Sequence, residues 1–419
     1  MAFNRILIAN RGEIAIRLSR AIADCDATSV AVYAEDDAQS LHVRSADQAV
    51  ALQGQGVAAY LDAAQLIRIA KEQDCDAIHP GYGFLSENAD FARACQQAGI
   101  TFIGPAPEVL DTFGDKASAR RLAQQQGVPL TQGTNEPTTL EQARDFMQSL
   151  GDGAAVMLKA LAGGGGRGMR AVHDLAELDD AFARCSSEAT AAFGRGDLYV
   201  ERLIRRARHI EVQIIGDGTE VAHVWERDCT LQRRNQKLLE VAPAPSLDPA
   251  VREQLHAAAC TLTRAVGYRG LCTVEFLLDE ERGDFVFMEA NPRIQVEHTV
   301  TEAVTGLDLA VTQIQLAAGK TLAELGLTQA DIPAARGFAV QLRINLESMA
   351  ADGSTRPAGG TLSAYQPPSG PGIRVDGYGY AGYTTSPRYD SLLAKLIVHA
   401  GGDYPNTLRR AYRALCEFR

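Results

Sequence analysis

Short apolar runs alternate with longer amphipathic runs along the first hundred-odd residues, and this alternation constrains the fold more than any other feature of the chain. The short runs predict strands and the amphipathic runs predict helices. The predicted strands cover residues 6–9, 29–33, 77–79 and 101–103, and the predicted helices cover 12–23, 63–72 and 88–98. Because parallel strands need a crossover between them, repeated β-α units indicate a doubly wound parallel sheet.

Two loops follow ends of these predicted strands. The first, residues 10–13, lies where a Rossmann turn would lie, but it lacks G-x-G-x-x-G and so does not indicate a dinucleotide. The second, residues 79–88, lies at the carboxyl end of a strand, where open α/β sheets bind ligands. A plain turn with a helix cap at Ser86 or Asn88 is the alternative. A histidine, an aromatic residue and a glutamate in one loop favour a functional role.

A run of four glycines, residues 163–166, lies between a strand that ends near Lys159 and the residues Arg167-Gly-Met169. Consecutive glycines cost backbone entropy, so propensity does not explain them. They expose N–H groups and allow close backbone approach, which suits phosphate oxygens. The P-loop pattern is absent, and a flexible linker is the alternative. The flanking lysine and arginine favour a mobile glycine-rich lid over a nucleotide.

Two apolar runs, 272–278 and 283–289, flank a polar turn and predict a β-hairpin. Glu275 and Glu289 are equally distant from its centre, so they should be cross-strand neighbours on one face unless a bulge intervenes. Opposed carboxylates repel unless a proton or a cation lies between them. Oxygen ligands with an open coordination sphere suit Mg²⁺ that carries substrate phosphates. A protonated or solvated pair is the alternative.

Polar residues at a spacing of two follow the hairpin. Arg293, Gln295 and Glu297 alternate with Ile294 and Val296. If this piece is extended, the three polar side chains point one way and the two apolar ones point the other. An arginine and a glutamate that face one cavity are typical of a reaction site, and a structural ion pair is the alternative.

Three further segments carry patterned polar residues. Residues 208–214 alternate, which places His209, Glu211 and Gln213 on one face, and residues 232–237 carry three cations. Such a cluster is usually solvated surface, but here it can supply positive potential for an anion. From about residue 332 the chain becomes β-rich, beginning with a predicted strand at 338–345. We expect the chain to stop inside a helix, at 415–419, as part of a longer protein.

Composition limits the classes of partner and compartment. The formal net charge is −11, which disfavours nucleic acid as a partner. No apolar run has membrane length, and the N-terminus lacks a signal-peptide layout. The eight cysteines show no C-x-x-C pair and no zinc spacing, as expected for reduced thiols in the cytoplasm.

Taken together, these motifs resemble biotin carboxylase, the ATP-grasp component of acyl-CoA, pyruvate and urea carboxylases. The resemblance spans nearly the whole chain and rests on residues 8–15, 79–88, 163–169, 232–237, 293–298 and 389–391. It implies an α/β fold, α+β overall, in three parts. These are a pre-ATP-grasp doubly wound parallel sheet at 1–113, an ATP-grasp domain at 114–331 with a glycine-rich lid at about 131–203, and a truncated β-rich C-terminal biotin carboxylase domain at 332–419.

The resemblance also implies an activity, the first half-reaction of a biotin-dependent carboxylase. ATP with Mg²⁺ or Mn²⁺ phosphorylates bicarbonate to carboxyphosphate, and the carboxyl group then joins N1 of biotin, so the enzyme is a C–N ligase. No Met-Lys-Met sequence occurs, so the biotin belongs to a separate carrier domain or chain. The other expected partners are a carboxyltransferase and a second copy of the chain or a larger complex, with neither nucleic acid nor membrane.

Site roles follow from the same resemblance. The implied nucleotide contacts are Lys116, Lys159, Gly164, Gly165, Gly166, Gly168, Met169, Glu201, Arg202, Ile204, His209, Gln232, Asn235 and Leu277. The implied metal residues are Glu275, Glu289 and Asn291. The implied bicarbonate residues are Lys237, Arg293, Gln295 and Val296, with Glu297 as the general base. Arg343 would stabilise the enolate-like ureido oxygen of biotin, and Tyr82 would line the biotin site.

Two departures and two alternatives complete the interpretation. Asn235 stands where many free-standing bacterial forms have histidine, and the lid begins Ala160-Leu-Ala-Gly163 where a serine and an additional glycine are common. We expect an altered ribose contact and slightly altered lid mobility. Another ATP-grasp ligase would keep the lysines, lid and metal glutamates but would not explain Arg293, Glu297 and Arg343 together. A non-catalytic nucleotide sensor predicts decay of the metal pair or the base, and neither is missing.

Overall fold

The N-terminal residues form the predicted parallel sheet. The computed structural model describes residues 2–134, 136–151, 153–161 and 168–419. Five strands pair in the order β3-β2-β1-β4-β5. They are β1 (Arg5–Ile8), β2 (Thr28–Tyr33), β3 (Gln48–Ala51), β4 (Ala77–His79) and β5 (Thr101–Phe102). The connecting helices are α1 (Gly12–Ala23), α2 (Leu41–Ser45), α3 (Gly56–Tyr60), α4 (Ala63–Glu72) and α5 (Ala89–Gln97), followed by α6 (Pro107–Gly114).

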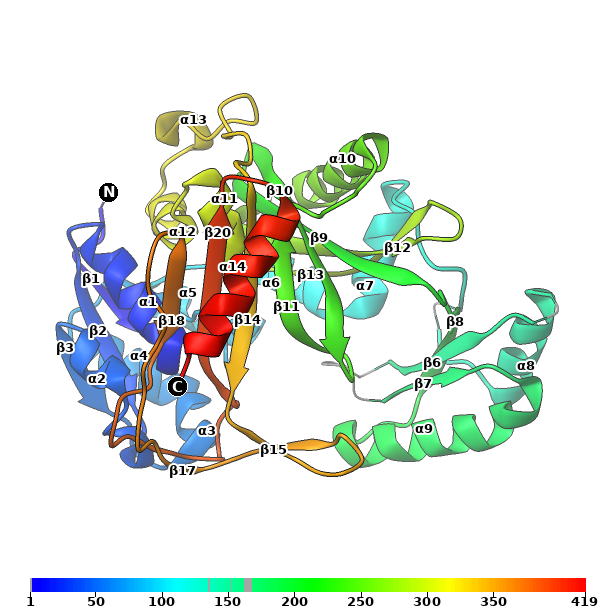
Figure 1. Cartoon of the computed structure of the whole chain (residues 1–419), viewed down its shortest axis with the longest axis horizontal. Helices are drawn as coiled ribbons and strands as arrows, with labels where there is room; N and C mark the ends of the chain where they lie inside the picture. The colour runs from blue at the N-terminus through cyan, green and yellow to red at the C-terminus, as the bar shows by residue number, and fades with distance from the viewer. Residues whose placement is uncertain (1, 135, 152, 162–167) are drawn as a thin grey trace.

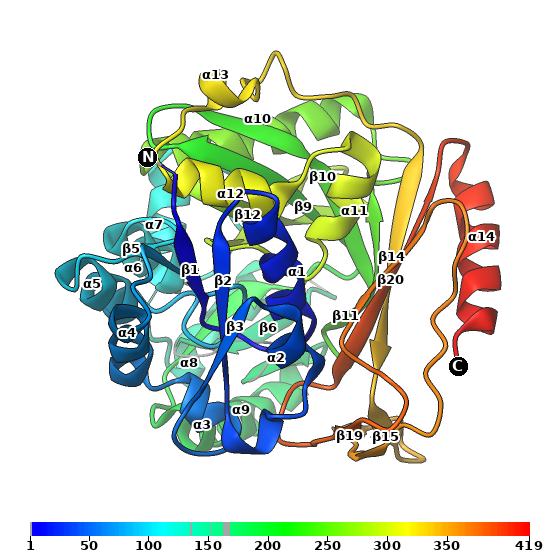
Figure 2. The same ribbon diagram turned by 90° about the vertical axis from the view of Figure 1, so that its left-hand side faces the viewer.

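Helices cover both faces of this sheet, so the doubly wound prediction is confirmed (Figure 2). Ile6 and Ile8 of β1 pack in one apolar cluster with α1, whereas Leu7 packs in another with α4 and α5. The alternation of side chains along a strand produces this division. The three predicted helices and the predicted strands match within a residue or two, but β3, α2, α3 and α6 were not predicted. The edge strand β3 is mostly exposed and therefore lacks an apolar pattern.

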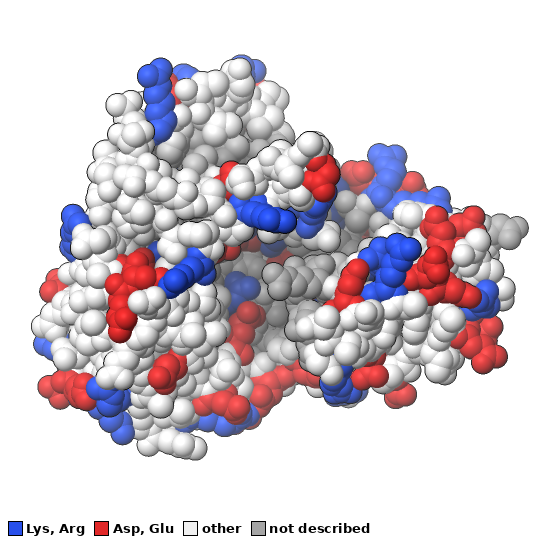
Figure 3. Space-filling view, turned by 90° about the horizontal axis from the view of Figure 1, so that it is seen from below, with Lys and Arg blue, Asp and Glu red and all other residues white. Residues whose placement is uncertain are grey.

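A lobe of three antiparallel strands follows, which we call the lid lobe (Figure 1). Helix α7 (Lys116–Gln125) precedes it. The strands β6 (Val156–Ala160), β7 (Met169–Val172) and β8 (Leu198–Arg202) pack against α8 (Leu140–Ser149) and α9 (Leu178–Phe193). Figure 3 shows the molecule hollowed between this lobe and the rest of the protein.

An eight-stranded sheet forms the centre of the molecule, in the order β13-β12-β9-β10-β11-β14-β20-β18. Its strands are β9 (Ala207–Asp217), β10 (Val221–Arg233), β11 (Gln236–Ala242), β12 (Arg269–Asp279), β13 (Phe285–Asn291), β14 (Phe338–Asn345), β18 (Ile373–Gly377) and β20 (Leu392–Ala400). The strands β14, β18 and β20 come from the β-rich third part. Hydrogen bonds between β11 and β14 therefore join two predicted domains into one sheet.

Helices and short hairpins complete the chain. They are α10 (Pro249–Ala265), α11 (His298–Thr305), α12 (Leu309–Ala317), α13 (Leu322–Leu325) and α14 (Tyr404–Glu417), with the small pairs β15 (Glu347–Met349)–β16 (Thr355–Pro357) and β17 (Gly360–Thr361)–β19 (Thr384–Thr385). Two short 3-10 helices lie at Glu35–Asp37 and Leu175–Glu177. The expectation that the chain stops inside a helix is wrong, because α14 ends at Glu417 and Arg419 pairs through its backbone with Gln366.

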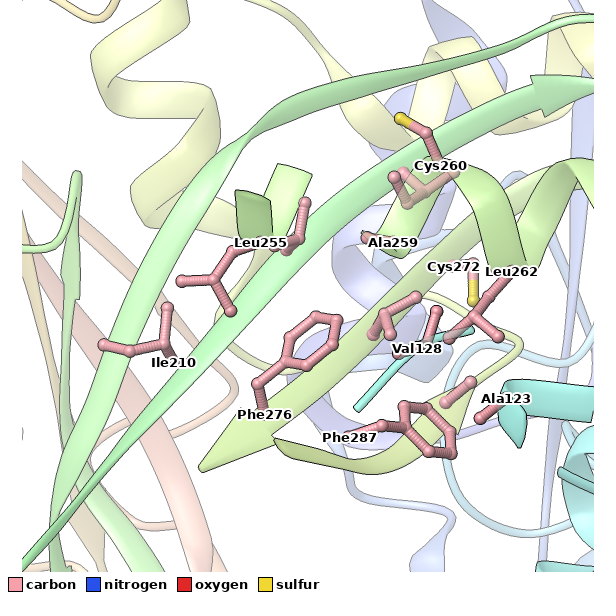
Figure 4. Close-up of a cluster of buried hydrophobic side chains, with 14 of the residues drawn as sticks. Ala123, Val128, Ile210, Leu255, Ala259, Cys260, Leu262, Cys272, Phe276 and Phe287 are labelled. Carbon is pink, nitrogen blue, oxygen red and sulfur yellow. The ribbon is translucent and has the colours of Figure 1, made fainter. Parts of the chain in front are cut away.

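The central sheet has one apolar face and one polar face in the β9, β12 and β13 region. Phe276 and Phe287 pack with Leu255 of α10 on the apolar face (Figure 4). The alternate residues of β9 are His209, Glu211 and Gln213, and they form polar contacts on the other face, as the sequence predicted. The helix α10 thus fills one side of the sheet and leaves the other for polar side chains.

The β12–β13 hairpin has the predicted register at its two glutamates, because Glu275 pairs directly with Glu289. Nearer the turn the pairing is shifted by one residue from the predicted register, because Phe276 pairs with Phe287 and not with Met288. A bulge at Met288 therefore separates the two registers. It turns the apolar residues toward α10 while keeping the glutamates opposed.

The piece after this hairpin is not an extended strand. Residues 292–297 form bends and a turn that lead into α11, with Glu297 at the helix N-cap position. Ile294 is fully buried, but Gln295 and Glu297 are nearly as buried, so the expected division into a polar side and an apolar side does not hold. The compact loop brings these polar side chains together in a different way, described below.

Gly337 controls the entry into β14, the strand that carries Arg343. Its φ is +64°, and a Cβ there would lie 2.0 Å from the carbonyl oxygen of Ala400 in β20. We expect Gly337→Ala to lower the free energy of unfolding by more than about 1 kcal/mol, since both the backbone and the contact are strained. Thermal or denaturant unfolding measures this effect. Gly353→Ala is the control, with φ +76° and open space at the Cβ, and an equal loss in both variants would contradict the contact argument.

Candidate functional site

Four charged residues form a row across the polar face of the central sheet. Glu289 of β13 pairs with Glu275 of β12, Glu275 pairs with Glu211 of β9, and Glu211 pairs with Arg227 of β10. Three carboxylates thus stand on neighbouring strands, which is unfavourable unless cations neutralise them. The row ends at Arg227, which is fully buried.

Lys237 of β11 supplies a second cation at this row. Its Nζ donates to Glu211 at 2.6 Å, to Glu275 at 3.1 Å and to Glu297 at 2.7 Å. Burial alone would lower the pKa of Lys237, but the three carboxylates raise it well above its usual value. The ammonium therefore stays charged, and it links the strand carboxylates to the loop before α11.

Glu297 lies between two cations. Besides Lys237, Arg343 of β14 donates from Nη2 at 3.3 Å. Burial would raise the pKa of Glu297, but Lys237 and Arg343 hold it far below its ordinary value. The carboxylate is consequently ionised at neutral pH, as a proton acceptor must be.

The predicted metal residues lie together and fit a divalent cation. The side chain of Glu289 makes no hydrogen bond or ion pair with any other described residue, and burial together with the charge of Glu275 raises its pKa. Asn291 donates at 2.8 Å to Glu275 and accepts at 2.9 Å from Arg293. An unneutralised carboxylate opposite a second one provides the oxygen ligands that Mg²⁺ prefers.

The predicted bicarbonate residues surround this pair. Gln295 donates at 2.9 Å to Glu275, and Arg293 lies 3.1 Å from a carboxylate oxygen of Glu87. Nζ of Lys395 donates to the backbone carbonyl oxygen of Val296 at 3.1 Å, so Val296 makes this contact through its backbone and not through its side chain. Glu87 belongs to the 79–88 loop, whose residues predicted a functional role, although no specific contact was predicted for it.

The predicted nucleotide residues lie along the lid lobe and the adjoining strands. Lys159 pairs with Glu201 at 2.5 Å. Burial lowers the pKa of Lys116, with the neighbouring charge of Glu289 acting in the opposite direction. Gln232 donates at 2.8 Å to Nδ1 of His209, whose Nε2 faces Glu275. This end of the site is therefore continuous with the metal pair.

The remaining predicted nucleotide residues comprise three apolar side chains and the glycines of the predicted lid. Ile204 is buried, Leu277 is half-buried beside His209, and Met169 pairs with Lys159 at the start of β7. Gly168 accepts a backbone hydrogen bond from Ala160, whereas Gly164, Gly165 and Gly166 lie outside the described residues.

The surroundings of Arg202 and Asn235 differ from those of the other predicted nucleotide residues. The Arg202 side chain follows Glu201 on β8 and therefore points to the opposite face, where it contacts Asp279 at 3.4 Å. Asn235 is exposed in a tight turn with φ 66°, next to Arg234 with φ 48°. Two successive positive φ values favour asparagine at a hairpin turn, so the residue type at 235 has a backbone reason.

Tyr82 and His79 occupy different places in the 79–88 loop. Tyr82 contacts Glu13 through its hydroxyl, and burial raises its pKa well above the usual value. His79 accepts from the Gly81 N–H, and burial lowers its pKa to about 3. His79 is therefore a neutral core residue, and Asn88 caps α5. The capping alternative is thus confirmed at Asn88, and the functional role of the loop stays a prediction.

Sequence reasoning missed two buried partners of the site. Glu240 of β11 accepts at 2.6 Å from Arg343 and at 3.0 Å from Gln341. Arg227 donates to Glu211 and Gln295. Both side chains are fully buried. Glu240 interrupts an apolar run at 238–242, which was an available signal, whereas Arg227 lies between Glu226 and Asp228 and gave none. Within the described part of the chain, no helix combines the length and apolar character needed to cross a bilayer.

Models of three protein families match successive parts of the chain. Residues 2–110 match the N-terminal domain of biotin carboxylase. Residues 115–325 match the ATP-binding domain of the carbamoyl-phosphate synthase L chain. Residues 341–419 match the C-terminal domain of biotin carboxylase.

Individual proteins are similar over the full chain. It is 49% identical to pyruvate carboxylase 1 of Caenorhabditis elegans, covering 100% of this chain but 35% of that protein. It is 48% identical to a biotin carboxylase of Nostoc sp., covering 100% of this chain and 92% of the relative. A solved structure, the biotin carboxylase domain dimer of Hydrogenobacter thermophilus 2-oxoglutarate carboxylase with MgADP, ADP and bicarbonate, is 41% identical with a TM-score of 0.92, covering 100% of this chain and 91% of that one.

The chain thus spans about a third of the pyruvate carboxylase that it matches and nearly all of the biotin carboxylase. The predicted resemblance and the predicted fold class are confirmed by these matches. The chain belongs to the biotin carboxylase family, whose ATP-grasp fold it shares.

Proposed function

We propose that this chain catalyses the MgATP-dependent carboxylation of biotin by bicarbonate, through carboxyphosphate. The observation that carries the proposal is the position of Lys237, whose Nζ contacts a carboxylate of the predicted metal pair, Glu275, and the predicted base, Glu297. The phosphate end and the carboxylation end of a site are thereby joined through one cation. The solved relative described with MgADP and bicarbonate supports the same pairing of ligands.

The first step activates bicarbonate. Lys237 and Arg293 hold the anion, and Glu297 accepts its proton, which makes the remaining oxygen a better nucleophile toward the γ-phosphate of ATP. Glu275 and Glu289 would hold Mg²⁺, with Asn291 beside them. A divalent cation at such a pair neutralises phosphate charge. Lys116 and Lys159 would contact the phosphates from the lid-lobe side.

The second step transfers the carboxyl group. Carboxyphosphate breaks down to CO₂ and phosphate, the phosphate removes the proton from N1 of biotin, and N1 then attacks the carbon of CO₂ to form the new C–N bond. Arg343 stabilises the enolate-like ureido oxygen that develops, as a fixed cation does for developing negative charge. The Glu240 carboxylate accepts a hydrogen bond from Nε of Arg343 and so holds the guanidinium in place during this step. Tyr82 would line the entrance used by biotin.

The biotin would arrive on a carrier domain or chain, and a carboxyltransferase would use the product. We further propose a homodimer or a larger carboxylase complex and a cytoplasmic location. Another ATP-grasp ligase is the second candidate, because residues 115–325 match a carbamoyl-phosphate synthase family. ATP cleavage that depends on an amine instead of biotin would favour it.

Glu297→Gln tests the base. The variant keeps the shape of the side chain but cannot accept the proton, so bicarbonate-dependent ATP cleavage should fall by about 100-fold or more. Binding of MgATP, measured by calorimetry, should remain. Glu253→Gln, on the exposed side of α10, is the control and should retain activity. Full turnover of Glu297→Gln would exclude this residue as the base.

Glu289→Gln tests the metal pair. Loss of one charged ligand should raise the Mg²⁺ concentration for half-maximal activity by about tenfold or more. Titration of bound Mn²⁺ by electron paramagnetic resonance measures the same loss without turnover. Glu281→Gln, exposed in the turn of the same hairpin, should leave both values unchanged. Unaltered Mn²⁺ affinity in Glu289→Gln would contradict its role as a ligand.

A further inference from the structure

Arg227 has a complete set of hydrogen-bond partners. A guanidinium carries five N–H donors in a fixed planar fork. Nε donates to Glu211, Nη1 donates to Gln213 at 2.7 Å and to Thr301 at 3.0 Å, and Nη2 donates to Thr273 at 3.0 Å and to Gln295 at 3.3 Å. Five donors therefore meet five acceptors, each on a different residue.

This cluster is closed to solvent. Arg227, Glu211, Thr273 and Thr301 are 0% exposed, and Gln295 is 3% exposed. A buried arginine is costly unless it is paired and fully hydrogen-bonded, and this one satisfies both conditions. Burial alone therefore accounts for the complete set of partners, and the functional argument rests on which side chains the fork orients. The fork also determines the directions of two side chains that the proposed reaction uses.

The first of these directions concerns Lys237. Glu211 offers one carboxylate oxygen to Arg227 and the other to Lys237, at 2.6 Å. The second concerns Gln295, whose Oε1 accepts from Arg227 while Nε2 donates to Glu275. An amide can be rotated by half a turn with little change of shape, and a donor at Oε1 excludes the wrong orientation. Arg227 thus fixes the carboxylate that anchors Lys237 and the amide of Gln295, two of the residues proposed to hold bicarbonate.

We propose that Arg227 is a positioning residue for bicarbonate, which acts through Glu211 on Lys237 and directly on the Gln295 amide without touching a substrate. The inference rests on the proposed function, and it adds a residue that the motifs do not contain. A lysine at 227 keeps the positive charge beside Glu211, but it cannot supply the planar fork. The orientation of Gln295 then becomes free while the charge balance of the row is kept.

The test compares two Michaelis constants in Arg227→Lys. The KM for bicarbonate should rise by about tenfold or more, while the KM for ATP changes by less than about twofold, because the nucleotide residues do not contact Arg227. In a Gln295→Ala background, Arg227→Lys should raise the KM for bicarbonate by a smaller factor, because the amide that Arg227 orients is already absent. Thr301→Val is the control, because it removes an acceptor that holds no site residue; it should lower the melting temperature and leave the bicarbonate KM unchanged.

Several outcomes would overturn the proposal. A folded Arg227→Lys with equal changes in both KM values, or with neither changed, would make Arg227 a purely structural residue. If Arg227→Lys does not fold, Glu211→Gln takes its place, and an unchanged bicarbonate KM there would overturn the anchoring of Lys237. Wild-type protein without bicarbonate-dependent ATP cleavage would overturn the proposed function instead. A crystal structure of Arg227→Lys with Gln295 and Lys237 undisplaced would then overturn the positioning role separately.

Discussion

The site depends on the neutralisation of three carboxylates that stand side by side on the central sheet. Glu289, Glu275 and Glu211 occupy directly paired positions on successive strands. Removing one partner from a buried ion pair costs about 3–5 kcal/mol, because an uncompensated charge remains. Arg227 and Lys237 neutralise the Glu211 end of the row. Glu289, at the other end, has no such partner among the described residues, and this is the place where a divalent cation fits.

This constraint explains why one sheet has to cross the boundary between the predicted domains. Lys237 and Glu240 lie on β11, and Arg343 lies on β14, which pairs with β11. The hydrogen-bond ladder fixes the separation of these strands, so the cations reach Glu297 from two strands at once. A hinge between the two parts would let Arg343 move relative to Glu297. The continuous ladder instead holds Lys237, Glu240 and Arg343 at fixed separations, and it thereby joins the proposed metal end to the proposed biotin end.

Sequence patterns predicted the elements whose structure is determined by interactions within one segment of the chain. The helix at 12–23 and the strand at 338–345 match because their apolar periodicity is complete within the segment. The Glu275–Glu289 pair could be counted from a hairpin turn because both strands are adjacent in sequence. Arg227 and Glu240 could not be found in this way, since Gln295 in the loop before α11 and Arg343 on β14, their partners, are distant in sequence. The loop at 292–297 was also beyond reach, because the fit of Ile294 into the core overrides its alternating pattern.

The low proton affinity of Glu297 places a condition on its use as a base. Lys237 and Arg343 both contact the carboxylate, and together they hold its pKa far below the ordinary value. A carboxylate in that state accepts a proton poorly. A bicarbonate anion bound by Lys237 competes with Glu297 for that cation, and it brings a second negative charge close to the carboxylate. Both effects raise the affinity of Glu297 for a proton. In the proposed mechanism Glu297 therefore becomes a stronger base when bicarbonate binds, whereas without bicarbonate it is an ion-pair partner of Lys237 and Arg343.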